Sequence, residues 1–212
     1  MPKKSVQIGH VKLTPKNSAL LVIDMTNFCA HEKCEIKQWN IIFKKIRKMA
    51  KRLVKFIELF KTEFGGKVIY VNCTPWEKEY LAPNIVELYK DPKARYYSKD
   101  TSGFSEEFHL VRPEKDDFIV TKNTYDAFTN PKLEKYLKKN KIKYVIVTGI
   151  FSEGCVHATI NGGFSKGFNF VILKDLVETA DDKKRQQMQK DLIDRTWPLM
   201  FGKTVSSKEL VK

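Results

Sequence analysis

Several short, mostly apolar segments have the composition of strands buried on both faces of a sheet. They are rich in β-branched residues and show no alternation of polar and apolar positions. The predicted strands are Ser18–Asp24, Lys67–Cys73, Asp117–Thr121, Tyr144–Thr148 and Phe168–Leu173, with a short terminal strand at Lys203–Ser206.

Apolar positions at helical spacing lie between these strands. Residues 38–63 have apolar positions at a period close to 3.6 residues, and Gly65-Gly66 follows as the signal that ends the predicted helix. Further helices are predicted at Pro131–Lys139, at 154–165 and at 182–195. Strands that alternate with helices predict parallel pairing and right-handed crossovers. We therefore expect an α/β, three-layer doubly wound fold: a mostly parallel sheet of about six strands with helices on both faces.

The length and composition fit a single domain over residues 1–212. A chain of 212 residues with 42% hydrophobic content can bury one large core. We expect residues 1–15 to be an N-terminal extension. Residues 74–116 are interrupted by four prolines and a glycine and are expected to be a loop region on the substrate side.

Targeting and membrane signals are missing from the sequence. The first eleven residues contain no signal-peptide core, and no apolar run approaches membrane-spanning length. The four cysteines show no disulfide-type spacing, which indicates a reducing compartment. We expect a cytoplasmic protein without membrane contact.

The formal net charge of +14 raises the question of a nucleic-acid partner. The lysines are interleaved with core-type residues, as in Phe43–Lys48, and no nucleic-acid-binding motif accompanies them. Solvated helix faces are the preferred interpretation, and we expect no nucleic-acid partner. A non-catalytic basic protein that binds an acidic partner stays open as an alternative.

Three polar residues stand at the carboxyl ends of predicted strands: Asp24, Lys122 and Cys155. Ligands of open parallel sheets bind at this edge. Taken singly, Asp24 could cap a helix, Lys122 could be a solvated lysine and Cys155 could be a small buried hydrophobe. Together they favour a site. Cys155 falls in the first turn of a predicted helix, so we expect a lowered thiol pKa and the highest reactivity of the four thiols.

Three segments carry a resemblance to a known superfamily: LVIDMTN at 21–27, VTKNTYDAF at 120–128 and TGIFSEGCV at 148–156. They resemble, in the same order, motifs of the isochorismatase-like cysteine hydrolases. That superfamily includes nicotinamidases, N-carbamoylsarcosine amidases and ureidoacrylate amidohydrolases. The resemblance covers roughly Ser18 to Glu178.

The resemblance implies a catalytic triad of Asp24, Lys122 and Cys155. Cys155 would attack an amide or ureido carbonyl and form a thioester acyl-enzyme, with Asp24 as acid and base and Lys122 as the charge that orients them. It also implies an oxyanion hole made by the N–H groups of Phe151 and Cys155, with a cis peptide bond between Ile150 and Phe151.

One departure from the superfamily concerns metal. Nicotinamidases carry an Asp-x-His motif after the second strand, whereas Asn72–Lys78 contains no histidine. We therefore expect no metal, no other cofactor and poor activity on nicotinamide. Cys29, His31 and Cys34 could bind zinc, but an ordinary loop near the pocket mouth is the preferred interpretation.

Phe28, Trp76 and Tyr125 are candidates for an aromatic substrate pocket, although core positions are an open alternative. Arg95 and Arg112 could bind a substrate carboxylate, but surface positions are preferred for both. The sequence thus predicts a cysteine-dependent hydrolase of a small amide or ureido compound, acting as a homo-oligomer. An isochorismatase-type vinyl-ether hydrolase is a second enzymatic alternative, and Cys155 argues against it.

Overall fold

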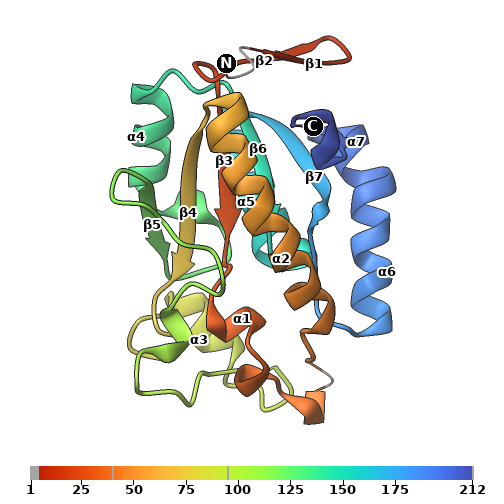
Figure 1. Ribbon diagram of the computed structural model, residues 1–212. Helices are drawn as coiled ribbons and strands as arrows, with labels where there is room; N and C mark the ends of the chain where they lie inside the picture. Colours follow the sequence, from red (N-terminus) through yellow and green to blue (C-terminus); the bar gives the residue numbers. More distant parts are fainter. Residues whose placement is uncertain (1–4, 40, 95, 212) are drawn as a thin grey trace.

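Six parallel strands form one sheet at the centre of the molecule (Figure 1). This computed structural model describes residues 5–39, 41–94 and 96–211. In spatial order the strands are β5 (Phe118–Lys122), β4 (Lys67–Cys73), β3 (Ser18–Ile23), β6 (Tyr144–Gly149), β7 (Asn169–Val177) and β8 (Gly202–Val205). The α/β parallel sheet expected from the sequence is confirmed.

Helices cover both faces of this sheet, giving the expected three layers. They are α2 (Lys44–Leu59), α4 (Pro131–Lys139), α5 (His157–Ser165), α6 (Lys183–Asp191) and α7 (Trp197–Met200). Leu20 and Val22 of β3 pack into the core beneath α2, whereas Leu21 and Ile23 pack with α4, α5 and α7 on the opposite face. Because consecutive side chains of β3 enter opposite cores, the strand is apolar throughout.

The predicted helix over 38–63 begins later than expected, at Lys44, and ends at Leu59 before a turn of π-helix. Its amino terminus is fixed by a distant residue: the Asp181 carboxylate accepts the N–H groups of Lys44 at 2.9 Å and Lys45 at 3.1 Å. A carboxylate satisfies the unpaired donors of a first turn and complements the helix dipole. That cap lies 137 positions away in sequence, so helical periodicity alone could not locate the boundary.

Other element boundaries differ by smaller amounts. β7 continues to Val177 rather than ending at Leu173. The helix expected over 182–195 begins after the N-cap Asp182 and continues through a π-helical turn, Leu192–Thr196, into α7. The expected N-terminal extension contains an antiparallel hairpin of β1 (Val6–Ile8) and β2 (Val11–Leu13), and residues 1–4 lie outside the described residues.

The region from 74 to 116 lies at the carboxyl edge of the sheet. It contains α3 (Pro83–Leu88) and a short 3-10 turn at Phe104–Glu106, and it contacts α1 (Asn27–Ala30) through a bridge between Thr26 and Phe108. In Figure 1, β3 and β4 run toward α1 and α3. These segments therefore cover the edge where ligands of parallel sheets bind.

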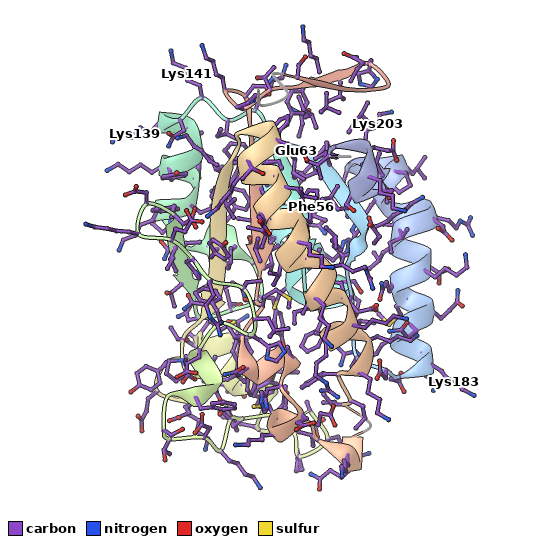
Figure 2. The ribbon with its side chains drawn as sticks, in the orientation of Figure 1. Phe56, Glu63, Lys139, Lys141, Lys183 and Lys203 are labelled. Carbon is purple, nitrogen blue, oxygen red and sulfur yellow. The ribbon has the colours of Figure 1, made fainter. Side chains whose placement is uncertain are left out.

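The lysines are carried by separate elements of the molecule. Figure 2 shows Lys139 on α4, Lys141 just after it, Lys183 at the start of α6 and Lys203 on β8, whereas Phe56 of α2 is buried. Among the described residues, no helix has both the length and the apolar character needed to cross a membrane.

Candidate active site

Asp24, Lys122 and Cys155 lie at one edge of the sheet. Asp24 follows β3, Lys122 is the last residue of β5, and Cys155 lies in the turn between β6 and α5. Since these strands are parallel, their carboxyl ends lie together. All three residues are buried, with exposed fractions of 1%, 2% and 8% in that order.

The Lys122 ammonium is the centre of this cluster. Its Nζ lies 2.8 Å from Asp24 Oδ2, 3.4 Å from Cys155 Sγ and 3.0 Å from Cys73 Sγ, and it donates to the carbonyl oxygen of Thr124 at 3.0 Å. A buried ammonium is tolerated only when its donors have partners. The two charged side chains and two thiols therefore form one hydrogen-bonded group.

The protonation states differ from the sequence expectation. Burial acts to lower the pKa of Lys122, but the Asp24 carboxylate and the sulfurs of Cys155 and Cys73 raise it well above its usual value. Burial raises the pKa of Cys155 well above its usual value, and Asp24 raises it further, whereas Lys122 lowers it. The expected low thiol pKa is thus wrong: the resting group is a thiol beside a base.

The backbone places the Asp24 carboxylate in the cluster. Asp24 adopts a left-handed conformation with φ of 51°, which is uncommon for a residue with a side chain. Its N–H donates to the carbonyl oxygen of Val71 at 2.9 Å, and its own carbonyl oxygen accepts the N–H of Thr26 at 2.8 Å. These bonds hold a conformation that turns the chain sharply at the end of β3.

Gly149 explains why β6 ends on a glycine. Its φ is 111°, and a Cβ built there would lie 2.1 Å from the carbonyl oxygen of Ile23. The adjacent Ile150 N–H donates to that same oxygen at 3.0 Å. A close approach of two backbones at positive φ requires glycine.

We expect Gly149→Ala to destabilise the fold by at least about 2 kcal/mol, because both the backbone conformation and the contact with Ile23 become unfavourable. Urea unfolding followed by circular dichroism measures this. Gly167→Ala is the matched control, since Gly167 also has positive φ, 87°, but no atom lies within 4 Å of its built Cβ. An equal loss in both variants would show that the Ile23 contact is unimportant.

The turn that carries Cys155 is compact. The peptide bond between Ile150 and Phe151 is cis, and the Phe151 carbonyl oxygen accepts the N–H groups of Gly154 at 3.0 Å and Val156 at 3.1 Å. Within the described residues, the Phe151 N–H donates no backbone hydrogen bond outside regular elements. This donor is therefore available to a ligand beside the Cys155 thiol.

Comparison with known proteins places this site in a family. The model of the isochorismatase domain matches residues 18–209. The chain belongs to the isochorismatase family of hydrolases. An uncharacterised isochorismatase family protein of Bacillus subtilis (strain 168) is 25% identical over 160 residues, which cover 76% of this chain and 73% of the relative.

Several solved structures share the fold. N-carbamoylsarcosine amidase from Thermoplasma acidophilum matches with a TM-score of 0.66 and 23% identity, covering 90% of this chain and 96% of the other. Nicotinamidase from Bacillus subtilis matches with a TM-score of 0.68 and 18% identity, covering 90% of this chain and 99% of the other. An isochorismatase-like hydrolase from Alkaliphilus metalliredigens matches with a TM-score of 0.69 and 19% identity, covering 91% of this chain and 96% of the other.

In this isochorismatase-family chain, an ion pair that the sequence did not reveal supports the Cys155 turn. The Glu153 carboxylate pairs with Arg185 of α6 and accepts the hydroxyls of Thr179 at 2.8 Å and Ser152 at 3.0 Å. The Arg185 guanidinium lies 4.6 Å from the centre of the Phe151 ring. Glu153 lies inside the quoted motif, but nothing in the sequence connects it with Arg185.

The three aromatic pocket candidates come together above the cluster. Trp76 lies 6.3 Å from Phe28 and 6.1 Å from Tyr125 between ring centres. Sequence analysis missed Tyr89, whose hydroxyl accepts the Trp76 indole N–H at 3.2 Å. Burial chiefly raises the pKa of Tyr89, and Cys73 packs against the same aromatic group.

The possible ligands of a metal ion are separated. The part of the chain that the structure describes holds no group of three or more His, Cys, Asp or Glu side chains placed to bind a metal. Cys29 is buried, Cys34 is half-buried, and the His31 Nδ1 accepts the N–H of Lys33 at 3.1 Å. The expected loop is instead helical in part, since Cys29 belongs to α1 and Cys34 to a 3-10 helix, Glu32–Cys34, and neither forms such a group with His31.

Of the two arginines considered as carboxylate ligands, Arg112 does not join the cluster. Arg112 is exposed and donates to the carbonyl oxygens of Phe108 at 3.0 Å and Val111 at 2.9 Å. Arg95 lies outside the described residues.

Proposed function

We propose that this isochorismatase-family hydrolase is a cysteine hydrolase that cleaves a C–N bond of a small amide or ureido compound through a thioester acyl-enzyme. The observation that carries the proposal is the buried contact of one ammonium with an acid and a thiol: Lys122 Nζ lies 2.8 Å from Asp24 Oδ2 and 3.4 Å from Cys155 Sγ. A nucleophile, a base and an orienting charge are the parts that acyl transfer requires.

In the proposed first step, the Cys155 sulfur attacks the carbonyl carbon while its proton moves to the Asp24 carboxylate. The raised thiol pKa makes a proton acceptor necessary, and the Asp24 carboxylate, whose negative charge contributes to that rise, is the acceptor proposed. The carbonyl oxygen gains negative charge, which the N–H groups of Phe151 and Cys155 stabilise. Lys122 remains an ammonium and stabilises the negative charge that develops on the sulfur as its proton leaves.

The tetrahedral intermediate then expels its nitrogen. Asp24 donates the proton that it accepted to the departing nitrogen, the C–N bond breaks and the thioester on Cys155 remains. An amine is a poor leaving group unless protonated, so an acid at this position suits amides. Water then attacks the thioester with Asp24 as base, which releases the acid and restores the thiol.

Two further observations support this substrate class. One structural neighbour is an N-carbamoylsarcosine amidase, which supports amide or ureido chemistry by likeness of fold. The aromatic residues Phe28, Trp76 and Tyr125 adjoin the cluster and provide an apolar wall for a small planar group.

The test is a panel of nicotinamide, N-carbamoyl amino acids, ureido acids and simple aliphatic amides, followed by ammonia release. We expect at least one carbamoyl or ureido compound to be hydrolysed, nicotinamide to be poor, and rates to be equal before and after dialysis against EDTA. The Cys34→Ser variant controls for thiol loss far from the cluster. Stoichiometric zinc with brisk nicotinamide hydrolysis that chelation abolishes would contradict the proposal.

A further inference from the structure

A second thiol, Cys73, lies inside the cluster. It is the last residue of β4, and the strand order β5-β4-β3 places β4 between the strands that lead to Lys122 and Asp24. Cys73 and Lys122 are register partners, and the N–H of Thr74 donates to the Lys122 carbonyl oxygen at 2.8 Å. The backbone thus fixes Cys73 beside both charged residues.

Cys73 makes a hydrogen bond to each of them. Its sulfur accepts from Lys122 Nζ at 3.0 Å, and its S–H donates to Asp24 Oδ1 at 3.5 Å. The other carboxylate oxygen, Oδ2, faces Lys122 at 2.8 Å. Each oxygen of the carboxylate therefore has its own partner, which prevents the carboxylate from turning both oxygens toward the ammonium.

The Cys73 thiol keeps its proton over the pH range of an assay. Burial raises the pKa of Cys73 to about 12, with the Asp24 carboxylate adding to the rise. Its S–H is consequently a permanent donor to Asp24, and a donor to a carboxylate stabilises the charged form.

We propose that Cys73 is a positioning residue for Asp24: it holds the carboxylate in the orientation that accepts the Cys155 proton. This proposal rests on the proposed function for its kinetic consequence. It concerns the arrangement of the base and assigns Cys73 no contact with substrate.

The kinetic test compares Cys73→Ala with Cys73→Ser. In Cys73→Ala we expect kcat to fall about 10- to 100-fold with KM little changed, since the lost interaction orients the base. The acidic limb of the kcat/KM–pH profile should move to higher pH, because the carboxylate loses a donor to its charged form. Cys73→Ser, which keeps an O–H donor, should recover most of kcat and return the limb toward lower pH.

Cys29→Ala is the matched control. Cys29 is also buried, and the Asp24 charge acts on its thiol, but its sulfur makes no hydrogen bond to Asp24 or Lys122 among the described residues. A packing defect would affect both alanine variants alike, whereas the shifted pH limb is expected only for Cys73→Ala. An unshifted limb in Cys73→Ala, or a serine variant no better than alanine, would overturn the proposal.

A second measurement needs no substrate. The rate of Cys155 alkylation by iodoacetamide is followed against pH by peptide mass spectrometry. In Cys73→Ala, Lys122 loses a competing sulfur and its ammonium can interact more strongly with the Cys155 thiolate, so the midpoint should fall to lower pH, with no change in Cys29→Ala. An unchanged midpoint would overturn the role of Cys73, whether or not any amide is hydrolysed. Inert behaviour of every amide tested would contradict the proposed function alone.

Discussion

Cys155→Ala is expected to lower amide hydrolysis by roughly four orders of magnitude or more while leaving the fold intact. The substitution removes the sulfur that would form the thioester, and no other group in the cluster can replace it: Cys73 is held between Asp24 and Lys122. Because the side chain loses one atom in a position that is 8% exposed, the effect on stability should be small. Initial rates and circular dichroism test both statements.

The same variant reports on the acyl-enzyme. Rapid acid quench followed by intact-protein mass spectrometry should show the mass of an acyl group on the wild-type protein and none on Cys155→Ala. Cys34→Ala, which alters a half-buried thiol outside the cluster, should retain both the wild-type rate and the adduct. A Cys155→Ala protein that keeps more than about one-hundredth of the wild-type rate would rule out covalent catalysis at this residue.

Much of the fold could be predicted because the strands are short and apolar on both faces. The six residues of β3 are all buried, and such runs between helical segments permit few arrangements. The boundaries set by distant partners could not be predicted in this way. The start of α2 depends on a hydrogen bond to Asp181, which lies 137 positions later in the sequence. The extension of β7 to Val177 depends on pairing with Gly149 across a bulge.

The candidate site shows a similar division. Chemistry at the ends of parallel strands pointed to Asp24, Lys122 and Cys155, and the structure brings these side chains together. The same rule points to Cys73, the last residue of β4, so a thiol at a strand end is the sequence signal for this missed residue. The pairing of Glu153 with Arg185 has no sequence signal, because it joins a turn to a helix 32 positions away.

The error over the Cys155 pKa has a physical cause. The expectation weighed the helix amino terminus and Lys122, both of which favour a thiolate. It omitted burial and the Asp24 carboxylate, which both favour the thiol and outweigh Lys122. The Asp24 carboxylate, 2.8 Å from the ammonium, offsets part of the field that Lys122 exerts on the sulfur 3.4 Å away.

The pairing of Asp24 with Lys122 leads to a further prediction, on stability as well as activity. The two side chains are 1% and 0% exposed, so either single substitution leaves a buried charge without its partner. We expect Asp24→Asn and Lys122→Met each to lower the free energy of unfolding by roughly 3–5 kcal/mol. The sequence does not show that the pair is buried and therefore does not predict this loss of stability.

The double variant separates stability from catalysis. Asp24→Asn/Lys122→Met contains neither charge, and the replacement of a buried ion pair by neutral side chains is often close to neutral in stability. We therefore expect its urea midpoint to exceed that of either single variant, while all three variants lose about three orders of magnitude or more in kcat/KM. Lys138→Met, which breaks the exposed pair with Glu134, is the control and should change stability little. If the loss of stability in the double variant equals the sum of the single losses, Asp24 and Lys122 act independently, and the cluster is not the coupled unit that the proposed mechanism requires.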